Sequence, residues 1–203
     1  MDITTRDELG QQWDFDKQSM RRKGTRRLRE QAPDLRIGSP MCTMFSSWQR
    51  INRFGDIDRH KTEFKKARRH MPFVCELYQM QFENGRLLLH EHPAQADSWS
   101  EPCVEKLLRR AKVAIVEMDQ CQLGQSNPHG GPVKKPTRWM SNCEEILEEL
   151  DQRCTGRGGL RSASKRLHAV CSGKTDREAA IYPFEMRRPF SRGSGEIWKR
   201  VAA

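Results

Sequence analysis

The stretch "RLLLHEHP" (residues 86–93) predicts a buried strand at the centre of the fold. Three consecutive leucines favour a strand that is covered on both faces, as the strands of parallel sheets are. The predicted strand ends at Glu91, which stands between His90 and His92. Because ligands of such sheets bind beyond the carboxyl ends of the strands, Glu91 is a candidate site residue.

Helices and strands alternate on both sides of this stretch. Helix-forming residues, or apolar side chains at steps of three or four, predict helices at residues 18–31, 58–84, 102–111 and 141–150. Short apolar runs predict strands at residues 35–37, 86–91 and 112–118, and a cluster of glycine, proline and lysine predicts a loop at 124–138. The alternation predicts an α/β fold with a parallel sheet and covering helices.

Proline, glycine and capping residues mark where the helices should begin, bend or end. Pro33 stops the first helix, and Gly85 is a natural terminator of the second. Pro72 lies inside the second helix, where we expect a kink or a break, because proline in a helix interior costs about 3 kcal/mol. Ser141 or Asn142 is expected to cap the last helix.

The length of the chain and its composition suggest one intracellular domain. The 203 residues divide into a basic N-terminal segment (1–33), an α/β core (34–150) and a flexible basic C-terminal region (151–203). No apolar stretch approaches the roughly 20 residues that span a bilayer, and the polar N-terminus does not resemble a signal peptide. The seven cysteines, an odd and scattered set, favour reduced thiols over a disulfide framework. We therefore expect an intracellular protein without membrane contact.

The formal net charge of +10 is concentrated in two basic runs, at residues 17–29 and 50–70. Lysine and arginine attract nucleic-acid phosphates by releasing counterions, so nucleic acid is the expected partner. The alternative is an ordinary solvated helix face, which is common. The candidate contacts are Arg21, Arg22, Arg26, Arg27, Arg50, Arg53, Lys134 and Lys135.

Between the two basic runs, Cys42 lies in the loop that follows the first predicted strand. A cysteine after one strand and a glutamate after the next would lie side by side above a parallel sheet. Such a pair suits covalent chemistry on cytosine: the thiolate adds to ring carbon 6, the acid assists at nitrogen 3, and carbon 5 becomes nucleophilic enough to accept a methyl group. The sequence therefore indicates Cys42 and Glu91 as a catalytic pair.

At these residues the chain resembles the cytosine carbon-5 DNA methyltransferases. "IGSPMCTMFS" (37–46) is similar to their Pro-Cys loop, and "LLLHEHP" (87–93) to their Glu-Asn-Val strand end. "KKPTRWMSN" (134–142) is similar to the Lys-Pro-Thr-Arg segment of divergent, phage-like members. The resemblance implies a Rossmann-like class I methyltransferase sheet, S-adenosylmethionine as cofactor and DNA as substrate. It also implies that Cys42 is the nucleophile, that Glu91 contacts the base, and that Arg138, with Lys135, steadies the base or its phosphates.

The chain departs from the family's pattern in ways that keep a second interpretation open. Met41 replaces a proline, His92 and Pro93 replace Asn-Val, and Arg36 interrupts the first strand. No glycine-rich turn for S-adenosylmethionine precedes residue 34, so we expect a sheet that is incomplete on its N-terminal side, as in a truncated chain. Its exposed edge would favour self-association. The alternative function is a non-catalytic basic fragment that binds nucleic acid.

Potential zinc ligands gather near the C-terminus. Cys154, His168 and Cys171 offer two thiols and an imidazole, and Cys143 could be a fourth ligand. Their spacing is irregular and Cys143 falls on a predicted helix, so the favoured interpretation is reduced thiols and a surface histidine. We therefore expect no metal in the site residues.

Overall fold

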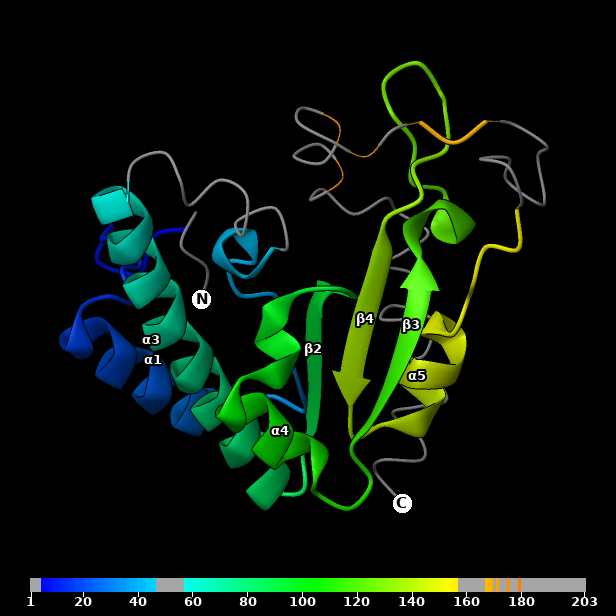
Figure 1. Ribbon diagram of the computed structural model, residues 1–203. Helices are drawn as coiled ribbons and strands as arrows, with labels where there is room; N and C mark the ends of the chain where they lie inside the picture. The colour runs from blue at the N-terminus through cyan, green and yellow to red at the C-terminus, as the bar shows by residue number, and fades with distance from the viewer. Residues whose placement is uncertain are drawn as a thin grey trace. The chain divides into compact units, whose positions relative to one another are not determined.

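A computed structural model describes residues 5–46, 57–156, 167–169, 171, 175 and 179 (Figure 1). The chain divides into two compact units. Unit 1 contains residues 1–90 and 96–111, and unit 2 contains residues 91–95 and 112–203. Each unit has its own strands and helices, and the strands follow the order β1-β2-β4-β3 in a mixed sheet of four strands. The predicted α/β class is confirmed at this level.

Unit 1 is built on two helices that lie side by side in Figure 1, α1 (Gln18–Gln31) and α3 (Ile57–Glu83). Leu28 of α1 packs with Phe73 and Leu77 of α3 in a buried apolar cluster. The unit also holds β1 (Leu35–Gly38), η1 (Thr43–Phe45), η2 (Asp97–Ser100) and α4 (Pro102–Leu108). Helix α3 contacts β1 and α4 as well as α1, so it is the element around which the unit is assembled.

The long helix α3 confirms the prediction from apolar spacing and corrects one detail. It ends before Gly85, whose φ of +67° is the left-handed conformation that glycine adopts at little cost. It also continues through Pro72, so the break that was one of two predicted outcomes does not occur. Pro72 is exposed, while its neighbours Met71 and Phe73 are buried, and packing of this apolar face holds the helix together across the proline.

Strand β2 (Leu87–Pro93) confirms the central buried strand but is longer than predicted. Its first six residues, Leu87 to His92, are all buried. It pairs with β1 in parallel, from Leu35 opposite Leu87 to Gly38 opposite His90. Glu91 therefore lies inside the strand rather than just after its end, which corrects the expected placement. The residues from Glu91 onward belong to unit 2.

Unit 2 is built on β3 (Ala114–Asp119) and β4 (Pro136–Ser141), which are covered by α5 (Glu144–Leu150) (Figure 1). The two strands are antiparallel, with Ala114 opposite Ser141 and Asp119 opposite Pro136. The prediction of a parallel sheet is thus right for β1 and β2 and wrong for β3 and β4. A short helical turn, η3 (Gln120–Leu123), follows β3.

Strand β4 was not predicted, because residues 124–138 were assigned to a loop and the next helix was expected from residue 141. Proline is tolerated at the first residue of a strand, and Trp139 and Met140 bury their side chains. Helix α5 consequently starts later, with Cys143 as its N-cap instead of Ser141 or Asn142. The Ser141 hydroxyl still contributes, since it accepts the N–H of Cys143 at 3.1 Å.

Other predicted bounds shift modestly. Helix α1 has the predicted bounds, α4 is shorter than the predicted 102–111, and β3 starts two residues later than predicted. Most of the predicted C-terminal region, residues 151–203, lies outside the described residues. Among the helices of the described part of the chain, none has the length and apolar character that crossing a membrane requires.

The hydroxyl of Tyr78 joins α3 to both strands of unit 1. It donates to the carbonyl oxygen of Gly38 on β1 at 3.0 Å and lies 3.2 Å from Nδ1 of His90 on β2. A Cβ placed on Gly38 would come within 2.1 Å of this hydroxyl, so glycine is required for the close approach. The ring of His90 in turn packs edge-on against Trp99 at 5.2 Å between ring centroids.

We predict that Tyr78→Phe destabilises unit 1 by about 1–3 kcal/mol. The substitution keeps the ring but removes the hydroxyl, which leaves buried hydrogen-bonding groups of β1 and β2 unsatisfied. The measurement is the urea midpoint followed by circular dichroism, with Gln79→Ala on the exposed side of the same helix as the control. A Tyr78→Phe midpoint equal to that of the wild type would refute the role of this hydroxyl.

Candidate functional site

The three residues predicted to be catalytic are divided between the two units. Cys42 lies in unit 1, where it is half-buried, precedes η1, and accepts the N–H of Phe45 with its carbonyl oxygen at 2.9 Å. Glu91 and Arg138 lie in unit 2, on β2 and β4. Glu91 is buried, with an exposed fraction of 6% for the whole residue. Each residue is therefore positioned by a different strand or by the loop that follows one.

The predicted cations of β4 and the loop before it engage acidic residues of β3. Arg138 donates to one carboxylate oxygen of Glu117 at 2.7 Å, and Arg153 donates to the other oxygen at 2.7 Å. Lys134 places its ammonium group 4.0 Å from a carboxylate oxygen of Asp119. These ion pairs compete with any bound phosphate for the same cations.

The predicted nucleic-acid contacts of α1 are also partly engaged within unit 1. Arg21 donates to the carbonyl oxygens of Phe15 and Asp16, at 2.5 and 2.8 Å, and Arg27 donates to Glu8 at 2.8 Å. Arg22 is exposed, and so is Arg26, which lies 3.7 Å from Glu30. Arg50 and Arg53 lie outside the described residues. Arg21 thus fastens the start of the helix more than it presents a free charge.

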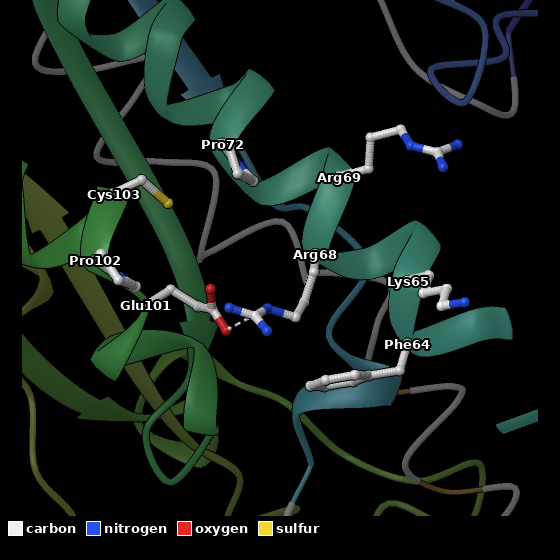
Figure 2. Close-up of a pocket in the computed structure, with 8 residues that line it drawn as sticks. All are labelled: Phe64, Lys65, Arg68, Arg69, Pro72, Glu101, Pro102 and Cys103. Carbon is white, nitrogen blue, oxygen red and sulfur yellow. Dashed lines mark ion pairs between the residues drawn. The ribbon is translucent and has the colours of Figure 1, made fainter. Parts of the chain in front are cut away.

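A pocket of about 540 Å³ opens between α3 and the start of α4, within unit 1. Its lining combines cations, one aromatic ring and one thiol: Phe64, Lys65, Arg68, Arg69, Pro72, Glu101, Pro102 and Cys103 (Figure 2). Arg68 reaches toward Glu101, at 3.5 Å between nitrogen and oxygen, whereas Lys65 and Arg69 extend away from Glu101. This pocket was not predicted, because it forms between helices that are distant in sequence.

The cations beside the pocket form a stripe along α3. Lys61, Lys65, Arg68 and Arg69 recur at helical spacing, and all four side chains are exposed. We call these four residues the basic stripe. The half-buried ring of Phe64 borders it, with the Arg68 guanidinium 5.9 Å from the ring centroid. Cations next to an aromatic face suit a ligand that carries both phosphates and planar rings.

Two thiols of unit 1 form a hydrogen-bonded pair at the pocket. Donation from Cys75 lowers the pKa of the half-exposed Cys103 thiol, although partial burial works in the opposite direction. The same hydrogen bond and burial raise the pKa of Cys75. Cys103 is therefore the member of the pair that holds a thiolate more readily, and its sulfur faces α3 across the pocket (Figure 2).

A second group of thiols lies in unit 2. The ligand atoms of Cys121, Cys154 and His168 all lie within 4.8 Å of one another. Two of these residues were singled out in the sequence, but Cys121 was not, although it lies only three residues beyond the predicted strand 112–118. Cys143, which the sequence offered as a possible fourth ligand, donates its thiol to the Glu145 carboxylate at 3.2 Å and is not part of the group.

Comparisons with known proteins leave the function to be argued from these residues. Neither family models, nor curated proteins, nor solved structures gave a match to the chain. The similarity to cytosine methyltransferases therefore rests on short motifs, and the pocket, the basic stripe and the thiol groups carry the structural argument.

We predict that Cys103 reacts with iodoacetamide at lower pH than an ordinary thiol does. Its lowered pKa gives a thiolate at lower pH, and the thiolate is the reactive form. Cys75→Ala removes the donor and should move the pH profile of Cys103 upward, whereas Cys75→Ser keeps a hydroxyl donor and should move it less. Mass spectrometry of labelled peptides gives the profile. An unchanged profile in Cys75→Ala would contradict the assigned hydrogen bond.

Proposed function

We propose that the protein binds nucleic acid along the basic stripe of α3, with Phe64 and the adjoining pocket as a stacking site. The observation that carries this proposal is the alignment of four exposed cations on one helix face beside an aromatic ring. Phosphates would contact the cations, and an unstacked base would lie against Phe64. Such a site favours single-stranded segments and little sequence preference.

The internal ion pairs of the stripe do not prevent phosphate binding. Arg68 pairs with Glu101 and Arg69 pairs with Asp16, but the arginine side chains are 56% and 50% exposed. Ion pairs between exposed side chains contribute only about 0–1 kcal/mol. The Glu101 and Asp16 side chains are less exposed, at 15% and 28%, so a phosphate would share the two arginines with these carboxylates instead of replacing them. Lys61 and Lys65 are exposed at the other end of the stripe. The stripe therefore offers several cations to one nucleic-acid strand.

We predict that Lys61→Glu combined with Lys65→Glu weakens binding to a single-stranded oligonucleotide and makes its salt dependence shallower. The slope of log affinity against log salt should fall by about 0.7 for each lost phosphate contact. Fluorescence anisotropy at several salt concentrations measures this slope. Lys106→Glu combined with Arg109→Glu, on the exposed face of α4, makes the same change of net charge. Equal losses in the two double variants would show that only net charge matters, contrary to the proposal.

A second candidate function, covalent chemistry on cytosine, is favoured by the parallel pairing of β1 with β2. The loop that carries Cys42 starts after Gly38, and Glu91 follows His90, the residue that pairs with Gly38. The methyltransferase resemblance implies roles for both residues, which belong to different units of the structure. Methyl transfer itself would need S-adenosylmethionine. The described residues before β1 do not fit that cofactor, since the element that precedes β1 is α1, which ends at Gln31, instead of a strand with a glycine-rich turn.

Addition of Cys42 to cytosine can be tested without the cofactor. The thiolate would add to carbon 6, a solvent proton would add to carbon 5, and loss of the original carbon-5 proton and of the thiolate would restore cytosine. We predict that wild type releases tritium from DNA that contains 5-tritiated cytosine. Cys42→Ser should release none while it keeps its affinity for DNA, and Cys103→Ser should behave as wild type. Release by Cys42→Ser equal to that of wild type would exclude this chemistry.

A further inference from the structure

We propose that unit 2 binds one zinc ion through Cys121, Cys154 and His168, with Cys171 as the fourth ligand. The three residues come from separate parts of the chain, and their ligand atoms converge within 4.8 Å. The spacing of residues along the sequence argued against a metal here. The convergence of Cys121 with the other two is the observation that reverses that expectation.

The distance between two of the ligand atoms matches a tetrahedral zinc site. Zinc binds sulfur at about 2.3 Å and imidazole nitrogen at about 2.0–2.1 Å, so these atoms lie about 3.6 Å apart when both are bound. The sulfur of Cys154 and Nε2 of His168 are 3.5 Å apart. Two thiolates and an imidazole bind zinc more readily than they bind harder divalent cations such as Mg²⁺ and Ca²⁺.

The scaffold of unit 2 fixes both cysteines. Cys121 lies in η3, directly after β3, and its side chain is fully buried. Cys154 follows α5, where its N–H donates to a carboxylate oxygen of buried Asp119 at 2.8 Å. The N–H of Asp119 donates to the carbonyl oxygen of Gln152 at 3.0 Å, so the segment that carries Cys154 is fastened twice to the end of β3. The cysteines are thus held in place by the backbone around them.

Among the described residues, Ala169 holds the segment that carries His168 to the loop before β4. The N–H of Ala169 donates to the carbonyl oxygen of Pro132 at 2.8 Å, and Ala169 bridges to Val133. Leu167 is 69% exposed, so it adds little apolar burial to hold the segment. A zinc ion bound to His168 would add an anchor through the side chain. The inferred role of the metal is therefore structural: it fastens this segment to the end of β3.

Cys171 is the fourth ligand that the sequence spacing suggests, although its thiol lies outside the group of three converging ligand atoms. It follows His168 with two residues between them, a spacing typical of zinc ligand pairs, and it is half-buried. Cys143 is excluded because its thiol donates to Glu145 at 3.2 Å. Structural zinc sites are closed by four protein ligands, so the proposal assigns the fourth position to Cys171.

The test uses the full chain, purified in reducing buffer without a histidine tag, and measures zinc content and zinc affinity by competition with a chromophoric chelator. We expect about one zinc ion per chain, with a dissociation constant on the order of nanomolar or below. Cys154→Ser and His168→Asn should each weaken binding by at least about tenfold. Cys143→Ser and His129→Asn, both in unit 2 and outside the group, should bind zinc as wild type does.

Cobalt substitution of the wild-type protein provides a readout of the site that needs no ligand variant. Replacement of zinc by Co²⁺ should give sulfur-to-cobalt charge-transfer absorption and the intense visible bands of a tetrahedral site. Cys171→Ser should reduce the charge-transfer absorption, and an unchanged spectrum would refute the assignment of the fourth ligand. The zinc site itself is refuted if the folded wild type binds no zinc. It is also refuted if the control variants lose zinc as the ligand variants do, or if zinc-loaded protein contains a disulfide between Cys121 and Cys154.

Discussion

The burial of β2 is the constraint on which the rest of the structure depends. A strand whose first six residues are all buried must be covered on both faces and paired along its backbone. In unit 1 the parallel partner β1 and the hydroxyl of Tyr78 meet that demand for the first half of the strand. The same strand carries the chain into unit 2 at Glu91, which is also buried.

The positions of the cations in the fold, more than their number, indicate which of them can bind phosphate. Several of the arginines and lysines that composition alone marks as phosphate ligands are engaged within the fold, as Arg21 is with backbone carbonyls and Arg138 is with Glu117. The basic stripe of α3 differs because its four cations share one exposed helix face beside Phe64 and the pocket. The inferred zinc site, in contrast, concerns unit 2 and does not depend on nucleic-acid binding.

The local sequence pattern was sufficient to predict the elements whose residue types or apolar spacing are distinctive. Helices α1 and α3 follow from residue type and apolar spacing, and β2 follows from its three leucines. Strand β4 was missed because two lysines precede it and Pro136 begins it, a composition that is typical of a loop. The buried pair Trp139 and Met140 was therefore not recognised as part of a strand. The direction of β4 could not be read from alternation, since antiparallel pairing is decided by contacts between strands. The pocket and the group of Cys121, Cys154 and His168 were not predicted from the sequence for a related reason: each consists of residues that only the tertiary fold brings together.

The central claim is that nucleic acid lies along the basic stripe of α3. Photocrosslinking of a single-stranded oligonucleotide to the full chain, followed by mass spectrometry of the crosslinked peptides, tests this most directly. The account predicts crosslinks on the peptides that contain Phe64 and its neighbours on α3, and their loss when excess unlabelled oligonucleotide competes. Crosslinks confined to other parts of the chain, with none on α3 in a sample that binds the oligonucleotide, would contradict it.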